Sequence, residues 1–253
     1  MPRSDDIAAF WDRQPCNVKH GSAPVGTREW SDQVTQRKYF VEPHIREFAD
    51  FDLWLHKDVL EIGCGIGTDS LEFLRAGVNR LDAVDVSMES LRLAYNRAEL
   101  YQGQDASFTR MDAQDELPWN KYDLIYSFGV IHHMQHPDLV LRAAWDRLKP
   151  DGELRIMVYA KYSLKKLLGQ QPEAQAGCPL VKWYSGWEAR RLLWNCGYRV
   201  VSIHKTHIFP WRLADYKAYR YIKAWPWRWM PGPIFRILER MMGTHLLIVA
   251  KKT

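Results

Sequence analysis

Residues 59–68, which read VLEIGCGIGT, constrain the fold of this chain more than any other segment. An apolar strand predicted over residues 58–61 runs into three glycines at alternate positions, Gly63, Gly65 and Gly67. Glycines with this spacing let the backbone turn sharply and leave no side chain between it and a ligand. The amphipathic helix predicted to follow offers unpaired N–H groups in its first turn. The segment therefore predicts a strand–turn–helix unit that binds a nucleotide-like molecule.

Two ligands compete for such a turn, a dinucleotide and S-adenosylmethionine. Dinucleotide folds use G-x-G-x-x-G and direct the helix N-terminus at a pyrophosphate, whereas the pattern here is G-x-G-x-G. Glu61 lies two residues before the first glycine, where a carboxylate would repel pyrophosphate but suit the ammonium and sulfonium groups of S-adenosylmethionine. Asp85 ends the next apolar strand and would accept from two ribose hydroxyls, a feature that a dinucleotide site shares. Asp112 ends the third predicted strand, where it could accept from an adenine amino group. The ordered set of three acids favours S-adenosylmethionine.

Residues 58–160 resemble a class I S-adenosylmethionine-dependent methyltransferase, closely in the core and loosely at the ends. The segments that carry the resemblance are VLEIGCGIGT, VDVS at 84–87, MDAQD at 111–115, YDLIYSFGVIHHM at 122–134 and LKPDGELRIMVY at 148–159. The most similar subgroup is the small-molecule methyltransferases that act on quinones, sterols, sugars and natural products. The resemblance implies an α/β, Rossmann-like fold with a seven-stranded, mostly parallel sheet, helices on both faces and an antiparallel last strand. It also implies an enzyme of class EC 2.1.1.- that uses S-adenosyl-L-methionine.

Further cofactor-binding residues follow from the resemblance. Val86 and Ala113, which follow Asp85 and Asp112, are placed at the cofactor together with these acids. Phe128 matches a family position whose backbone lines the methionine portion, although plain strand packing is an alternative. Tyr39 is predicted to cover the cofactor from a helix. Asp115 and Glu116 are alternatives to Asp112, because they lie close by in the sequence.

A pair of histidines follows the fourth predicted strand, where the methyl acceptor would approach. Histidine titrates near neutrality and can take a proton from a phenol or an alcohol. Similar proteins place a catalytic histidine in this loop, and His133 matches the commoner position. We therefore predict His133 as a general base, with His132 as the second candidate, and with packing under a lid as the alternative for both.

Strand and helix patterns alternate along the chain, as in a parallel sheet. The predicted strands cover residues 58–61, 81–84, 106–111, 122–128, 153–159, 198–207 and 245–251, and the predicted helices cover 5–13, 38–51, 68–76, 87–101, 138–148 and 185–196. We expect an N-terminal helical lid over residues 1–57 and a cofactor-binding domain over 58–253. Two insertions, at about 160–184 and 209–243, are predicted to close over the substrate, because ligands lie at the carboxyl ends of such strands.

The insertion at 209–243 holds the positive charge of the chain. Between Trp211 and Arg240 there are seven basic and two acidic residues, an excess equal to the formal +5 of the whole chain. Residues 211–225 lack glycine and proline and are predicted as a four-turn helix, with a second short helix over 234–242. Three interpretations are open: a substrate cap, a helix on an anionic membrane surface, and nucleic-acid binding.

The loop after the fourth strand argues against nucleic acid. Methyltransferases that modify exocyclic base amines carry an Asn- or Asp-Pro-Pro-aromatic loop there, whereas residues 127–130 read SFGV. We therefore expect a small-molecule acceptor, with the cap as the preferred interpretation and peripheral membrane contact through residues 211–240 as the second.

The cysteines and the apolar segments indicate the expected cellular location. Cys16, Cys64, Cys178 and Cys196 are scattered without metal-ligand spacing, which predicts reduced thiols and no metal site. No run of eighteen apolar residues exists, and the N-terminal sixteen residues are too acidic and interrupted for a secretory signal. A cytoplasmic enzyme is expected, with the inner membrane face as an alternative location.

The expected function is the transfer of a methyl group from S-adenosylmethionine to a small, partly apolar metabolite. Oxygen or carbon is the expected acceptor atom if His133 is a base, and nitrogen if it is not. The alternatives are a membrane-surface methyltransferase that acts on a lipid or quinone, and a protein that binds S-adenosylmethionine without catalysis. The oligomeric state has no signature in the sequence.

Overall fold

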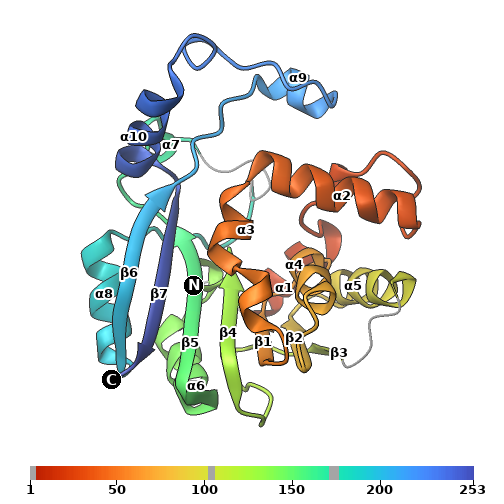
Figure 1. Cartoon of the computed structure of the whole chain (residues 1–253), viewed down its shortest axis with the longest axis vertical. Helices are drawn as coiled ribbons and strands as arrows, with labels where there is room; N and C mark the ends of the chain where they lie inside the picture. Colours follow the sequence, from red (N-terminus) through yellow and green to blue (C-terminus); the bar gives the residue numbers. More distant parts are fainter. Residues whose placement is uncertain (1–3, 102–105, 171–176) are drawn as a thin grey trace.

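The computed structural model describes residues 4–101, 106–170 and 177–253, which form one seven-stranded sheet with helices packed on it (Figure 1). The strand order is β3-β2-β1-β4-β5-β7-β6. Six strands run in one direction, and β7 lies antiparallel between β5 and β6. The predicted class of fold is therefore confirmed.

The elements follow the predicted alternation. The strands are β1 Asp58–Ile62, β2 Arg80–Asp85, β3 Ala106–Arg110, β4 Tyr122–Phe128, β5 Leu148–Tyr159, β6 Tyr198–Thr206 and β7 His245–Lys252. The α-helices are α1 Ser4–Arg13, α2 Arg28–Val41, α3 His44–Ala49, α4 Thr68–Arg75, α5 Met88–Leu100, α6 Pro137–Arg147, α7 Leu164–Leu167, α8 Gly186–Asn195, α9 Leu213–Lys217 and α10 Gly232–Met242. Three 3-10 turns, η1 Val18–His20, η2 Phe51–Trp54 and η3 Ile131–His133, lie in the connections.

The central strands are buried on both faces because helices cover both faces. Leu124 and Ile125 of β4 are adjacent in sequence and fully buried, and they belong to different core clusters. Ile125 packs in the cluster that contains Leu141 of α6, whereas Leu124 packs in the cluster that contains Phe73 of α4. Successive side chains of a strand point to opposite faces, so this sheet needs a near-continuous apolar sequence rather than an alternating one.

The helix predicted over residues 38–51 is wrong, because two helices share this region. Helix α2 begins ten residues earlier, where the Thr27 hydroxyl accepts from the backbone N–H of Trp30. It ends at Val41, and Glu42 leaves the helical region with φ −125°. Pro43 follows, and a proline disfavours the α conformation for the residue before it. The break places the start of α3 at the carboxyl edge of the sheet.

The four-turn helix predicted over residues 211–225 is also wrong. Only α9 forms there, and the chain reverses at Tyr219, which has φ 58°. Trp211 and Lys223 then pair as an isolated antiparallel bridge. The second predicted helix is confirmed as α10, which begins two residues earlier, with Pro233 in its first turn.

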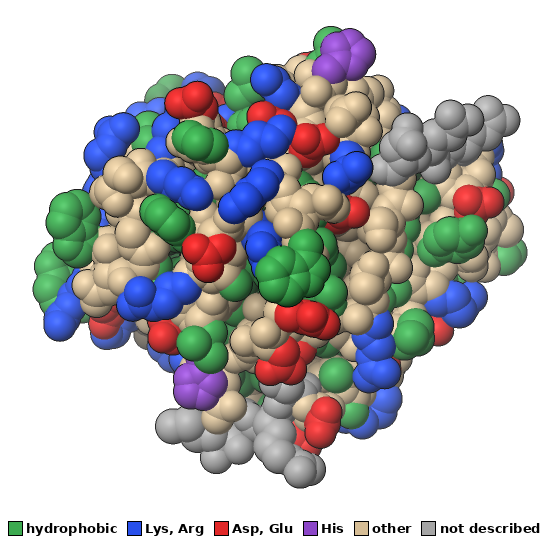
Figure 2. All heavy atoms as spheres, turned by 90° about the horizontal axis from the view of Figure 1, so that it is seen from below, with side chains coloured by type: hydrophobic (Ala, Val, Ile, Leu, Met, Phe, Trp, Pro, Cys, Tyr) green, Lys and Arg blue, Asp and Glu red, His purple; other side chains and the backbone are tan. Residues whose placement is uncertain are grey.

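The insertion that contains α9 and α10 lies above the carboxyl ends of the parallel strands, with α9 over α2 and α10 beside the end of β6 (Figure 1). Figure 2 shows the molecule from the opposite end, where acidic and basic side chains are interspersed. The elements added to the sheet are therefore gathered at the end where ligands of such sheets bind. Within the described residues, no helix combines the length and the apolar content that crossing a bilayer requires.

Candidate functional site

The turn between β1 and α4 has the backbone that its glycines predict. Gly63, Gly65 and Gly67 all have positive φ, at 75°, 54° and 71°. A Cβ on Gly63 would lie 2.2 Å from Val130 Cγ2, and one on Gly67 would lie 2.8 Å from Ala94 Cβ. A Cβ on Gly65 would meet no described atom within 4 Å. Two glycines are thus required by packing, while the middle one leaves its backbone open to a ligand.

Asp85 at the end of β2 is tied to the glycine turn. Its Oδ2 accepts from the Gly65 backbone N–H at 2.8 Å, and its Oδ1 accepts from the Ser87 N–H at 2.9 Å. Burial raises the pKa of Asp85, and these backbone donors oppose that shift. The carboxylate therefore holds the turn in shape from within the site, and its remaining lone pairs are available to hydroxyl donors.

Glu61, at the penultimate position of β1, is 4% exposed and accepts from the Ser70 hydroxyl. Burial is the main cause that raises the pKa of Glu61, and the nearby charge of Asp69 adds to it. A buried carboxyl whose charged form is disfavoured gains stability when a cation comes close. This electrostatic environment suits the ammonium group that the sequence predicts here.

The third acid lies across the same space. The Asp112 Oδ1 accepts from the Gln114 backbone N–H at 2.9 Å. Val86 and Ala113 lie beside the acids, and both line the same cavity as Asp85 and Asp112. The carboxyl ends of β1, β2 and β3 are neighbours in the sheet, so three acids far apart in the sequence meet at one edge.

A cavity of about 1880 Å³ opens over this edge. Sites for one drug-sized ligand typically measure about 300–1,000 Å³, so this cavity has room for a cofactor and a second molecule. Its walls come from the glycine turn, the ends of β2 and β4, helix α2, residues 7–21 and residues 207–227. The polar wall holds the acids, and Trp11, Phe209 and Trp227 contribute aromatic surface.

His133 lines the cavity and is 4% exposed. Its Nδ1 lies 2.6 Å from the Leu180 carbonyl oxygen, which can only accept, so Nδ1 carries the proton. The Nε2 atom is buried without a hydrogen-bond partner among the described residues. Burial lowers the pKa of His133 to about 4. The imidazole is therefore neutral near pH 7, with the lone pair of Nε2 free to accept a proton.

Three predicted site residues do not line the cavity. His132 is fully buried, with its ring centroid 4.1 Å from that of Tyr159, so only the second histidine of the pair faces the site. Gly67 supports the turn from behind, against α5. The Tyr39 hydroxyl donates to Asp69 Oδ1 at 2.7 Å, so this tyrosine supports the site indirectly. Glu61, Gly63, Gly65, Asp85, Val86, Asp112, Ala113, Phe128 and His133 do line the cavity.

A buried ion pair under the glycine turn was not predicted from the sequence. Lys38 Nζ lies 2.7 Å from Asp69 Oδ1, and Tyr126 donates to Asp69 Oδ2 at 3.0 Å. Lys38 and Asp69 both line the cavity, next to Glu61. Tyr39, the residue that was predicted instead, lies one position further along α2. If the helix had been predicted to start at Arg28, its periodicity could have distinguished the face of α2 that carries Lys38 from the face that carries Tyr39.

A second feature without a sequence prediction joins α2 to the insertion. The guanidinium carbon of Arg37 lies 4.2 Å from the Tyr216 ring centroid and 4.1 Å from that of Tyr219. Tyr216 also hydrogen-bonds the His20 Nε2 at 3.0 Å, and Tyr219 donates to the Lys19 carbonyl oxygen at 2.9 Å. We call these five residues the aromatic clasp. The clasp brings segments about 200 residues apart together on the wall of the cavity.

Comparisons with known proteins show the family of the chain. A family model described as "Methyltransferase domain" matches residues 34–203. The chain is 29% identical over 154 residues to a tRNA U34 carboxymethyltransferase of Alteromonas mediterranea, a match that covers 57% of this chain and 42% of that protein, which is less than half of the relative's length. It is 27% identical over 170 residues to a ubiquinone biosynthesis O-methyltransferase of Neisseria meningitidis, covering 59% of this chain and 71% of that protein.

Among solved structures, the fold is similar to that of geranyl diphosphate C-methyltransferase from Streptomyces coelicolor A3(2), crystallised with Mg²⁺, geranyl diphosphate and S-adenosyl-L-homocysteine. The TM-score is 0.64 at 15% identity, and the match covers 100% of this chain and 99% of that one. This likeness concerns the fold.

Proposed function

This chain belongs to the methyltransferase-domain family, and we propose that it moves a methyl group from S-adenosylmethionine to a small, partly apolar metabolite. The observation that carries the proposal is the pairing of Asp85 with the open Gly65 turn, on a cavity with room for two molecules. Family membership supports the donor, whereas the acceptor rests on the shape and chemistry of the cavity alone.

The residues of the turn fit the proposed donor. Asp85 and Asp112 offer carboxylate oxygens to the ribose and adenine, and Gly65 leaves room for the cofactor against the backbone. Glu61 offers a carboxyl group that a cationic amino-acid portion would stabilise in its charged form. Bound S-adenosylmethionine would supply an electrophilic methyl group at a sulfonium. The protein then has to align the acceptor and exclude water.

His133 fits the role of a general base. Its Nδ1–H is fixed by the Leu180 carbonyl, and Nε2 is the atom left to take a proton from an acceptor hydroxyl or carbon acid. The Trp11 ring lies at 5.5 Å from the imidazole, edge to face, and limits the space around it. This arrangement favours oxygen or carbon as the acceptor atom over nitrogen.

Arg37 indicates that the acceptor carries an anionic group. This side chain is 5% exposed and lines the cavity, and its Nε and Nη1 are buried without hydrogen-bond partners among the described residues. The third guanidinium nitrogen, Nη2, donates to the Tyr216 carbonyl oxygen. Unsatisfied buried donors of a charged group are costly, and oxygen atoms of a carboxylate or phosphate would satisfy Nε or Nη1 with a charge-assisted hydrogen bond. Together with the aromatic wall, Arg37 favours a metabolite with one anionic end and one apolar end.

Calorimetry with S-adenosylhomocysteine tests the donor site. We expect the wild type to bind, and Asp85→Ala to lose affinity by about a hundredfold or more, because two charge-assisted hydrogen bonds of about 1.5–3 kcal/mol each are removed. Asp115→Ala is the matched control, since Asp115, an alternative to Asp112 in the sequence, is exposed and does not line the cavity. Equal affinity in all three proteins would refute the pocket.

A labelled-methyl screen tests the acceptor. Purified protein is incubated with a radiolabelled donor and fractions of a metabolite extract, and the products are sorted by anion exchange. We expect label in anionic, partly apolar products. Turnover of only cationic or uncharged acceptors would contradict the role of Arg37 while leaving the donor site intact.

Two alternative functions are considered, one because an observation favours it and one because an experiment can distinguish it. A membrane-surface enzyme that acts on a lipid or quinone is favoured by the exposed apolar side chains of the insertion, among them Trp225 at 79% and Trp229 at 74%. A protein that binds S-adenosylmethionine without catalysis would bind the homocysteine product and transfer no label. The intact glycines and acids argue against this second alternative.

A further inference from the structure

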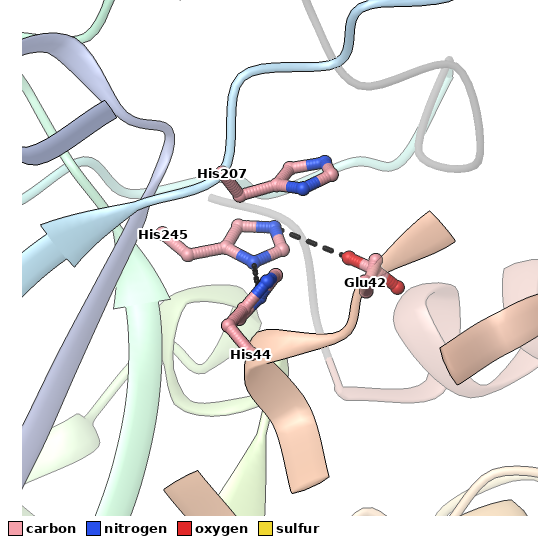
Figure 3. A group of neighbouring side chains, drawn as sticks. All are labelled: Glu42, His44, His207 and His245. Atoms are coloured by element: carbon pink, nitrogen blue, oxygen red, sulfur yellow. Dashed lines mark hydrogen bonds and ion pairs between the residues drawn. The ribbon is translucent and has the colours of Figure 1, made fainter. Parts of the chain in front are cut away.

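Three histidines and a glutamate meet beside the proposed acceptor space, although they are distant in sequence (Figure 3). Glu42 follows α2, His44 begins α3, His207 follows β6 and His245 begins β7. The nitrogen and oxygen atoms that these four residues can offer to a metal all lie within 4.8 Å of one another. We call this group the histidine–glutamate cluster.

The geometry of the cluster is compact. His44 Nε2 lies 2.9 Å from His245 Nδ1, and the ring centroids of His207 and His245 are 4.5 Å apart. In a tetrahedral zinc site, ligand atoms about 2.0–2.1 Å from the ion are about 3.4 Å from each other. Small rotamer changes would therefore bring the four groups from their present spacing onto one ion.

One close contact within the histidine–glutamate cluster is not a hydrogen bond. The Glu42 carboxylate lies 3.6 Å from His245 Nε2, which is too long for a hydrogen bond.

We propose that the histidine–glutamate cluster is a binding site for a divalent transition metal of the zinc class. Three imidazoles and one carboxylate match the donors that Zn²⁺ and similar ions take, whereas Mg²⁺ and Ca²⁺ require mainly oxygen ligands. The nearby charges are mixed. Lys38 is paired with Asp69, and Lys165 also acts on the cluster, while Asp69 contributes negative charge near Glu42. The site itself does not rest on the proposed function.

The location of the cluster gives the metal a role. Glu42, His207 and His245 line the same cavity as Phe128 and His133. A dication there could polarise an acceptor oxygen and favour its deprotonated form. This consequence, unlike the site, rests on the proposed function. This proposal differs from the sequence-based expectation of no metal site, because ligands from positions 42, 44, 207 and 245 show no local spacing motif.

Metal titration of the full-length, untagged protein tests the site. After chelation and dialysis, Zn²⁺ is titrated by calorimetry, and Co²⁺ is added in parallel to record its visible absorption. We expect one Zn²⁺ per chain, a tetrahedral or five-coordinate Co²⁺ spectrum, and no comparable binding of Mg²⁺. His207→Ala and Glu42→Gln should each weaken Zn²⁺ binding by at least about tenfold.

His204→Ala is the matched control, because His204 is an exposed histidine three residues before His207. It should bind Zn²⁺ as the wild type does. Glu42→Gln keeps the shape of the side chain, and circular dichroism verifies the fold of each variant. Zn²⁺ affinity that is equal in wild type, His207→Ala and Glu42→Gln, or an absence of stoichiometric binding in the folded wild type, would overturn the site. Binding of S-adenosylhomocysteine, measured alongside, reports on the proposed function separately.

Discussion

At the scale of the residue, the three glycines of the turn are not equivalent. Gly63 is required because any side chain would enter the space of Val130, whereas Gly65 has open space where its Cβ would be. Glycines at the same spacing are therefore required for two different reasons. One reason is packing and the other is access for a ligand.

Alanine at each of these positions should separate the two reasons. Gly63→Ala should destabilise the protein by more than about 2 kcal/mol, because the strain of a positive φ adds to the clash with Val130. Gly65→Ala should cost about 1–2 kcal/mol of backbone strain alone, yet it should weaken S-adenosylhomocysteine binding more than about tenfold. Urea unfolding and calorimetry measure the two effects. Loss of stability at Gly65 comparable to that at Gly63 would show that the open space is absent in solution.

His133 gives a prediction about turnover and its pH dependence. His133→Ala should leave the affinity for S-adenosylhomocysteine unchanged and lower turnover by about two to four powers of ten, as loss of a general base does. In the wild type, protonation of Nε2 removes the base. Because the pKa of His133 is lowered to about 4, kcat/KM should stay level down to about pH 5 and fall below it.

His136→Ala is the control, since His136 is an exposed histidine at the start of α6. A decline of kcat/KM centred near the ordinary histidine pKa of about 6.5 in the wild type would mean that the imidazole is solvated. Full turnover of His133→Ala would assign this residue to packing.

At the scale of the element, the insertion owes its shape to contacts with α2. The sequence of 211–225 has no helix breaker, yet α9 covers only Leu213–Lys217. Tyr216, inside α9, stacks on Arg37 and hydrogen-bonds His20. Tyr219, beyond the end of α9, stacks on Arg37 and donates to the Lys19 and Gly21 carbonyl oxygens, which holds it out of a continuous helix. Helix propensity differs by only a few tenths of a kcal/mol between such residues, so these contacts decide.

Hydrogen exchange tests whether the aromatic clasp closes the cavity. Tyr216→Ala removes one of the two Arg37 stacks and the bond to His20, so amides of residues 17–21 and 209–224 should exchange at least about tenfold faster. The amides of β1 and β4 should be unaffected. Trp229→Ala is the control, because Trp229 is 74% exposed and outside the clasp. Unchanged protection in Tyr216→Ala would show that other contacts hold the insertion in place.

At the scale of the whole molecule, the excess positive charge and a group of exposed apolar side chains lie in the same insertion. Residues 211–240 carry the formal excess of charge, and Ile234, Ile237 and Met241 form an exposed stripe along α10. Trp225 and Trp229 extend this apolar surface. Interfacial helices combine these features, so the membrane alternative can be tested alongside the cap.

Vesicle sedimentation decides between the two. If the insertion binds membranes, the wild type should sediment with vesicles that contain anionic phosphatidylserine, and Trp225→Ala/Trp229→Ala should reduce binding severalfold. Trp187→Ala/Trp194→Ala is the matched control, because these tryptophans are 66% and 68% exposed on α8. Trp227 is left intact, since it lines the cavity. Equal sedimentation of both variants would leave the cap as the role of the insertion.

The sequence by itself determined the sheet, the glycine turn and the row of acids, because each is encoded locally. An apolar strand, a glycine spacing and an acid at a strand end are neighbours in the chain, and the parallel fold then brings successive strand ends to one edge. The same logic predicted His133 after β4. The family resemblance ranked His133 above His132, and the tertiary structure added that His132 is buried away from the cavity. Only the tertiary structure distinguished Lys38 from Tyr39, because burial and direction depend on elements elsewhere.

The aromatic clasp and the histidine–glutamate cluster were decided by tertiary structure alone. Their residues come from segments about 160–200 positions apart, and no periodicity within one element links positions 37 and 216 or positions 44 and 245. Pro43 separates α2 from α3, which lets His44 at the start of α3 reach His245 of β7. The sequence shows the proline, but this contact appears only in the folded structure. Side chains that meet by folding over such distances leave no spacing in the sequence, because their contacts are fixed by how the elements pack.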